Sequence, residues 1–182
     1  MKEEESSLPP GTFEISLKLE QYNDIFSDFD IRSLNKRALS VDFLDEIKRA
    51  TSEMKDENIE MVLHMPEKDR KEYEEGIIKE RLATHFKRHF HLLQAEKKKI
   101  LKTGVGMVIL GIFSMIIAAV LYSRDDGSFF SSFLIIFFEP AAWFLWWEGL
   151  DQIIFNSKNI NPNLYFYRKM MNAHKNIHFK SY

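Results

Sequence analysis

Two long apolar runs near the middle of the chain constrain its fold more than any other feature. Residues 104–122 contain no charged side chain, and residues 128–147 contain one, Glu139. As an α-helix each run is about 30 Å long, which matches the hydrocarbon thickness of a bilayer. The sequence therefore predicts a membrane α-helical hairpin of two transmembrane helices over residues 103–150, with the lipid bilayer as its first partner.

Basic residues beside the two runs predict how the hairpin is oriented. Positively charged side chains near a transmembrane helix are retained in the cytoplasm. The connection between the runs, residues 123–127, has one basic side chain, Arg124. The outer ends of the runs are flanked by Lys87, Arg88, Lys97, Lys98, Lys99, Lys102, Lys158, Arg168 and Lys169. We therefore expect a multi-pass protein of the plasma membrane, by default a prokaryotic one, with both termini cytoplasmic.

The composition excludes several classes of function. Acidic and basic side chains nearly balance, 27 against 25, which argues against a nucleic-acid partner. The chain has no cysteine, so it offers no disulfide framework, no cysteine nucleophile and no thiolate ligand for zinc or an iron–sulfur cluster. The polar start MKEEESSLPPG lacks the apolar stretch of a cleaved export signal. No catalytic motif stands out, and we expect a non-enzymatic protein without a cofactor or a metal.

Alternation of apolar and polar residues predicts a small cytoplasmic α+β domain over residues 13–66, after a disordered tail at residues 1–12. Residues 13–19 and 59–65 alternate with period two, as half-buried strands do, and residues 41–54 carry one apolar helical face. Two strands and one helix are too few to form a stable sheet. We therefore expect the C-terminal segment, residues 151–182, to pack on this domain and add a strand near residues 177–181. The alternative is strand pairing between subunits.

An apolar stripe lies on the helical stalk predicted over residues 67–102. Its members recur every three or four residues: Ile78, Leu82, Phe86, Phe90 and Leu93. A helix that runs unbroken from there into the first apolar run would be about 80 Å long. Either the helix breaks, at Gly76 or near residues 97–99, or the stripe packs against the equivalent helix of another subunit. We favour a stalk that supports a homo-oligomer.

Glu139 is the residue of the apolar runs best suited to chemistry. A carboxylate at that depth is costly and usually faces a bundle interior or a wet cavity. Pro140 follows it and removes a backbone hydrogen bond, so the pair could form a kinked polar point for a cation or a proton. The structural alternative is a carboxyl group that hydrogen-bonds to the backbone or to Ser114 and fixes the register of the hairpin.

Two further groups of residues in the runs predict packing and interface positions. Small residues that let another helix approach, from the second run or from another subunit, recur on one face of the first run. They are Gly104, Gly111, Ser114 and Ala118. Trp143, Trp146 and Trp147 are typical of the aromatic belt at a membrane interface. The alternative for Trp143 and Trp146 is that they form, with Glu139, one helix face that attracts cations.

Histidines four residues apart, His85 with His89 and His174 with His178, have the spacing of a shared metal site. No third ligand is visible in the sequence, and a metalloprotease motif would require glutamate where the chain has Phe86. We therefore interpret the His85 segment as a solvated basic face that contacts anionic lipid headgroups.

Residues 138–155, FEPAAWFLWWEGLDQIIF, and residues 40–50, SVDFLDEIKRA, resemble a group of small, uncharacterised prokaryotic membrane proteins. The resemblance covers most of the chain from about Phe13. It implies two adjacent transmembrane helices with cytoplasmic ends, and it implies no activity, cofactor or catalytic residue.

Together these features predict an integral membrane scaffold or sensor, non-enzymatic and homo-oligomeric, whose cytoplasmic domain binds a protein partner. The alternative is an oligomeric ion channel or proton-coupled transporter in which Glu139 of each subunit lines a path. A membrane-embedded enzyme is the third class, and it would need a cytoplasmic pocket with convergent acids.

Overall fold

The computed structural model describes residues 12–52, 58–124, 127–173 and 176–182. It is mostly helical, with two long apolar helices and a small sheet of three parallel strands. The chain divides into two compact units, the sheet unit (Met1–His91 with Leu164–Tyr182) and the hairpin unit (Leu92–Asn163). The predicted disordered tail lies outside the described residues, except for Thr12, which already belongs to the first strand.

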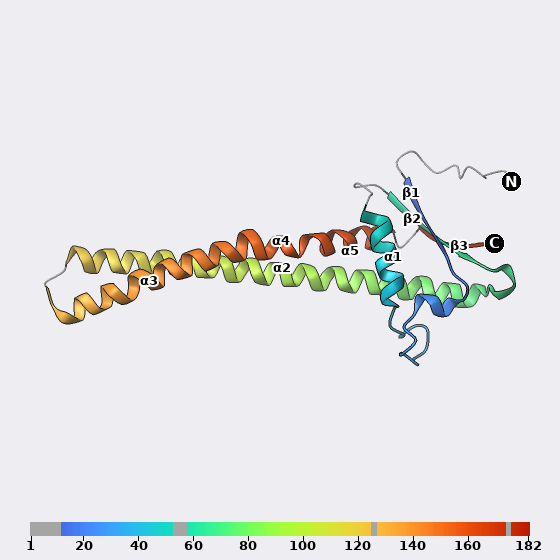
Figure 1. The fold of residues 1–182 in the computed structure, drawn as a ribbon, viewed down its shortest axis with the longest axis horizontal. Helices are drawn as coiled ribbons and strands as arrows, with labels where there is room; N and C mark the ends of the chain where they lie inside the picture. Colours follow the sequence, from blue (N-terminus) through green and yellow to red (C-terminus); the bar gives the residue numbers. More distant parts are fainter. Residues whose placement is uncertain (1–11, 53–57, 125–126, 174–175) are drawn as a thin grey trace. The chain divides into compact units, whose positions relative to one another are not determined.

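The strands of the sheet unit lie in the order β1-β2-β3 (Figure 1). β1 (Thr12–Lys18) and β3 (Ile177–Ser181) both pair in parallel with β2 (Asn58–Met65). The bounds of β3 agree with those that the alternation predicts, and the bounds of β1 and β2 differ from them by at most one residue. Because β1 lies near the start of the chain and β3 ends one residue before its last, both ends of the chain contribute to one sheet.

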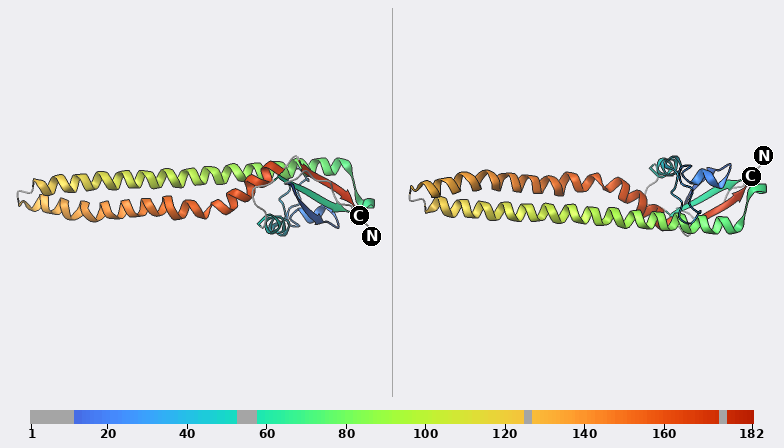
Figure 2. Two further views of the ribbon diagram at one scale, coloured as in Figure 1. Left: turned by 90° about the horizontal axis from the view of Figure 1, so that it is seen from above. Right: turned by 90° about the horizontal axis from the view of Figure 1, so that it is seen from below.

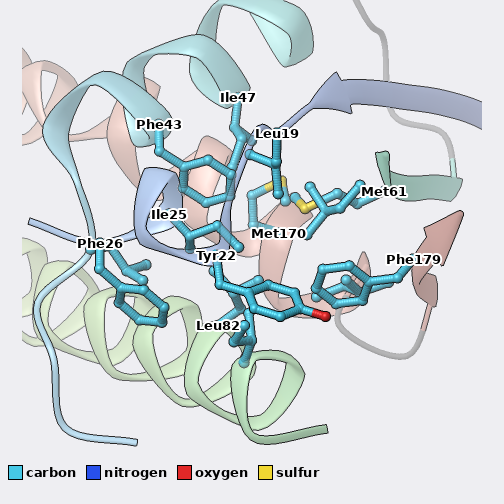
Figure 3. Close-up of a cluster of buried hydrophobic side chains, with 14 of the residues drawn as sticks. Leu19, Tyr22, Ile25, Phe26, Phe43, Ile47, Met61, Leu82, Met170 and Phe179 are labelled. Atoms are coloured by element: carbon cyan, nitrogen blue, oxygen red, sulfur yellow. The ribbon is translucent and has the colours of Figure 1, made fainter. Parts of the chain in front are cut away.

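Helical segments pack on one face of this sheet and bury its main apolar core (Figure 3). They are the 3₁₀ turn η1 (Tyr22–Ile25), α1 (Val41–Ser52), the first turns of α2 (Glu72–Ser123) and the end of α5 (Asn161–Ala173). Strand residues two positions apart share a face, so Met61, Leu63 and Met65 of β2 all point into the core and have no exposed surface. Their neighbours in the register come from β1 and β3.

The apolar stripe of α2 is used inside the sheet unit. Ile78, Leu82 and Phe86 are fully buried in its core, whereas Phe90 and Leu93 are half-buried. The prediction that this stripe faces another subunit is therefore wrong for its first three residues. Periodicity showed that the face is buried, but the covering elements come from distant parts of the chain.

α2 is continuous over 52 residues, and the 3₁₀ turn η2 (Glu67–Asp69) precedes it. Gly76 and residues 97–99 lie within the helix, so neither of the two predicted breaks occurs. The helix starts at Glu72 rather than at Glu67, and Glu72, Glu74 and Glu75 place three carboxylates in its first turn. Negative charge there is favourable because the N-terminal end of a helix carries partial positive charge.

The hairpin unit consists of the second half of α2 and of α3 (Phe129–Asp151), which lie side by side in opposite directions (Figures 1 and 2). The Ser128 side chain caps α3 by accepting a hydrogen bond from the Ser131 N–H. A π-helical turn, η3 (Gln152–Asn156), and α4 (Ser157–Asn159) continue the chain towards α5. The helices Glu72–Ser123 and Phe129–Asn159 are each long and apolar enough to cross a membrane.

Candidate functional site

Glycines bring the two helices of the hairpin unit into backbone contact. A Cβ placed on Gly104 would lie 2.8 Å from the Gly149 carbonyl oxygen, and one on Gly111 would lie 2.8 Å from the backbone nitrogen of Trp146. Both distances are far below an ordinary carbon contact. No larger residue fits at Gly104 or Gly111 unless α3 moves away.

The other two small residues of this face are less enclosed. Ser114 is half-buried, and Ala118 is half-buried and lines a cavity. The partner residues on α3, Ala142 and Gly149, are buried and were not singled out in the sequence. Their separation of seven residues equals that of Gly104 and Gly111, and this shared spacing is the signal that could have identified them.

Glu139 lines a cavity of about 450 Å³ between α2 and α3, together with Ala118, Tyr122 and Trp143. Its side chain is exposed, and within the described ranges it makes no hydrogen bond or ion pair. The carboxylate is therefore not tied to Ser114. Pro140 supplies no N–H to the Ile136 carbonyl, so a second oxygen near Glu139 lacks its usual helical donor.

The three tryptophans occupy different surroundings. Trp143 is 57% exposed and borders the Glu139 cavity, and its ring meets that of Trp146 edge to face with centroids 5.6 Å apart. Trp146 is half-buried because its backbone lies against Gly111. Trp147 is 64% exposed. Glu139 and Trp143 thus share one cavity, whereas Trp147 faces outward.

A polar cluster in the sheet unit was missed by sequence reasoning. Glu75, on the first turn of α2, accepts hydrogen bonds from Arg70 Nε at 2.8 Å and Nη2 at 3.0 Å, and from the Tyr22 hydroxyl at 3.1 Å. Arg70 Nη1 also donates to Ser181 Oγ of β3 at 2.9 Å, and the Lys71 N–H donates to the Tyr22 hydroxyl at 2.8 Å. The cluster joins β3, η1 and the start of α2.

Hydrogen bonding and burial set the protonation of this cluster. The Arg70 guanidinium lowers the pKa of Glu75, and the Glu75 carboxylate in turn raises the pKa of Arg70. Burial raises the pKa of Tyr22. Glu75 is therefore a charged, fully engaged carboxylate near neutral pH, which suits a structural role better than proton transfer.

A cavity of about 700 Å³ opens beside this cluster. Its lining includes the carboxylates of Glu67 and Glu72 and the cationic side chain of Lys79, whose Nζ lies 5.8 Å from the centre of the Phe179 ring. Acids do converge here, although Glu75 is already paired with Arg70. Charges of both signs on an open wall suit a small polar ligand.

His85 and His89 belong to an aromatic cluster between α2 and α5. Their ring centroids are 4.2 Å apart, and the His89 ring stacks on Tyr167 at 5.1 Å. His85 is 9% exposed, its Nε2 has no hydrogen-bond partner in the described part of the chain, and burial lowers its pKa to about 4. The interpretation of His85 as part of a solvated face is therefore wrong. His174 lies outside the described residues, and His178 Nε2 lies 3.7 Å from Glu60 Oε1.

The structure offers no clear metal centre in the part of the chain that it describes. Across residues 12–52, 58–124, 127–173 and 176–182, no group of three or more His, Cys, Asp or Glu side chains could hold a metal ion. The His85 and His89 rings are tilted by 35° to each other, and the His89 ring stacks on Tyr167.

One loop of the sheet unit presents two apolar side chains to solvent. Phe29 and Ile31 are each 99% exposed. Between them, Asp30 is held by the Ala38 N–H at 2.7 Å and by the Arg32 guanidinium at 2.8 Å. Arg37 closes the loop by donating to the Ser27 carbonyl at 3.0 Å. The exposed pair is therefore carried on a loop that its own polar contacts hold in place.

Comparison of the chain with protein-family models, with curated proteins and with solved structures finds no match. The resemblance of residues 138–155 and 40–50 to small prokaryotic membrane proteins therefore stays a prediction.

Proposed function

We propose that this protein is an integral membrane scaffold or sensor, non-enzymatic and homo-oligomeric, that holds an interaction domain at the cytoplasmic face of the plasma membrane. The observation that carries the proposal is the exposure of its apolar helices. Only 11% and 6% of the most apolar windows of α2 and of Phe129–Asn159 are buried within the chain. Exposure of so much continuous apolar surface is unfavourable in water and favourable in the hydrocarbon interior of a bilayer.

The sheet supports a hairpin with both termini on one side. β1 and β3 come from opposite ends of the chain and pair with the same strand, which supports a position of both ends on the same side of the membrane. An even number of crossings is then required, and two helices supply it. The excess of basic residues beside the outer ends of the two apolar runs supports a cytoplasmic position for that side.

The exposed loop supports an interaction role for the sheet unit. Phe29 and Ile31 gain nothing from full exposure in a free domain, and a buried apolar anchor is what a protein partner uses. The polar cavity beside Glu75 offers a separate place for a small ligand, which would make the domain a sensor. Glu139 is exposed in an apolar span, and a carboxylate at such a position needs polar interaction partners. Assembly of several copies would supply them.

Alkaline extraction of membranes tests the anchoring. We expect the full-length protein to stay in the membrane pellet at high pH and to enter solution only with detergent. Release of the folded protein by alkali alone would contradict the proposal, because peripheral proteins behave in that way.

A second candidate function, an oligomeric channel or proton-coupled transporter, is favoured by one observation. Glu139 faces a cavity without a partner among the described residues, as an ion or proton site would. Flux through reconstituted liposomes tests this function with the Glu139→Gln variant. The matched control is Glu148→Gln on the same helix, whose carboxylate already accepts a hydrogen bond from Gln152 at 2.9 Å. Flux that only Glu139→Gln abolishes would support transport, and no flux in any sample would reject it.

A further inference from the structure

β1 is an edge strand with a free side. Among the described residues its only pairing partner is β2, and no other element forms a backbone hydrogen bond with it. The Leu19 N–H donates to the His64 carbonyl of β2 at 2.8 Å. Backbone groups alternate in direction along a strand, so the N–H and C=O groups of Glu14, Ser16 and Lys18 point away from β2.

The sequence of this strand is chemically symmetric about Ser16. Residues 13–19 read FEISLKL, so reversing the strand places Glu14 opposite Lys18 and Ile15 opposite Leu17. Phe13 falls opposite Leu19, and Ser16 falls opposite itself. An antiparallel pair of two such strands therefore has apolar pairs on one face and two ion pairs on the other.

We propose that β1 pairs antiparallel with β1 of a second copy of this chain about a twofold axis at Ser16, which joins two three-stranded sheets into one of six strands. The inference rests on the proposed homo-oligomer and names its contact. The outward backbone groups are those that such a pair needs, because residues 14, 16 and 18 would all fall in hydrogen-bonded positions.

This pairing would remove two unfavourable features of the single copy, a buried carboxylate oxygen without a hydrogen bond among the described residues and an exposed phenylalanine. The Glu14 Oε2 atom is buried and accepts no hydrogen bond from any described residue, and the Lys180 ammonium group lies 3.6 Å away. Lys18 of the second copy would bring a further ammonium group to this carboxylate. On the other face, Phe13 is 43% exposed in the single copy and would be covered by the second β1.

The other edge of the sheet does not have this symmetry. In β3, reversal about Phe179 places His178 opposite Lys180, so two basic side chains would meet. The residues His178, Phe179 and Ser181 also line the polar cavity together with residues of α2. Like charges directly opposite each other destabilise a strand pair, so the two edges differ in their fitness for self-pairing.

Chemical crosslinking of the full-length protein in nanodiscs tests the proposal. The chain has no cysteine, so Ser16→Cys carries a single thiol, and paired residues would have Cα atoms about 5.5 Å apart. A short bismaleimide is expected to convert the Ser16→Cys variant into a covalent dimer. The control His178→Cys, exposed on the other edge strand, is expected to stay monomeric on a denaturing gel. A monomeric Ser16→Cys variant would overturn the proposal.

Charge reversal tests the register. Glu14→Lys or Lys18→Glu alone would create two like-charge pairs per dimer and weaken association roughly tenfold or more. The double variant Glu14→Lys with Lys18→Glu is expected to recover most of it. Glu60→Lys is the matched control, because it also reverses a charge and changes a cross-strand contact, that of Glu60 with His178 at 3.7 Å, but lies on the central strand. Absence of recovery in the double variant would contradict the register.

The outcomes separate the two proposals. If the protein resists alkaline extraction but Ser16→Cys gives no dimer, the contact at β1 is wrong and the membrane anchoring stands. If alkali releases the protein, the proposed function fails whatever the crosslinking shows. Ser16 is exposed, and its hydroxyl donates to Glu14 Oε1 of the same strand, so we expect Ser16→Cys to keep the fold. The crosslinking result then remains decisive even if a charge-reversal variant misfolds.

Discussion

Gly104 on α2 and Gly149 on α3 lie in reciprocal backbone contact. A Cβ on Gly104 would lie 2.8 Å from the Gly149 carbonyl oxygen, and a Cβ on Gly149 would lie 2.7 Å from the Gly104 carbonyl oxygen. Without side chains between them, the helices gain van der Waals contact and leave their apolar side chains facing outward.

Replacement of Gly149 by leucine is therefore expected to separate the hairpin helices. The added side chain would meet Val108 and the Gly104 backbone, and overpacking of this kind costs about 1–3 kcal/mol. Thermal unfolding in a mild detergent measures the loss. Gly106→Leu is the control, because nothing lies within 4 Å of a Cβ at that position. Equal destabilisation by both variants would contradict the contact.

Replacement of Glu75 by glutamine is expected to loosen the end of β3. The variant loses the charged hydrogen bonds to Arg70, and we expect a cost of about 1–2 kcal/mol. Faster hydrogen exchange in β3 and α2 would report it. Glu74→Gln, which removes the exposed pair with Lys71, is expected to change stability by less than about 0.5 kcal/mol.

The same carboxylate predicts an acid limit to stability. Its pKa is lower in the folded protein than the ordinary value of 4.5, so its contribution is complete above that value and is lost as the pH falls through the folded pKa. Glu75→Gln is expected to flatten this part of the pH profile of unfolding. An unchanged acid slope in the variant would show that other groups cause it.

His85 predicts a second pH dependence at milder acidity. Burial lowers its pKa from 6.5 to about 4, so the unfolded chain binds more protons between these values and stability falls as the pH drops from about 6.5 to 4. The loss is up to about 3 kcal/mol. His85→Phe, which keeps the aromatic contacts, is expected to remove most of this slope, whereas His178→Phe on the exposed strand should keep it. A slope retained in His85→Phe would refute the assignment.

Local patterns predicted much of the fold. The two apolar runs located both apolar helices, and period-two alternation located all three strands, because burial on one face leaves its period in the sequence. The direction of strand pairing was not predictable, since alternation does not encode it.

Contacts between residues far apart in the chain could not be predicted from the sequence. Tyr22 and Glu75 are 53 positions apart in the sequence, and Arg70 and Ser181 are 111 positions apart. No short sequence motif therefore indicates that these residues form a cluster. The apolar stripe of α2 also shows what periodicity cannot predict. Its period correctly marked a buried face at Ile78, Leu82 and Phe86, but a period does not tell whether the same chain or another subunit covers that face.

The central claim is that the chain crosses a membrane twice and keeps both ends on one side. Impermeant maleimide labelling of single-cysteine variants in intact cells tests it directly, because the native chain has no thiol. Arg124→Cys, between the helices, is expected to react from outside, and Lys36→Cys, exposed in the sheet unit, only after the membrane is permeabilised. Labelling of Lys36→Cys in intact cells, or protection of Arg124→Cys until permeabilisation, would contradict the account.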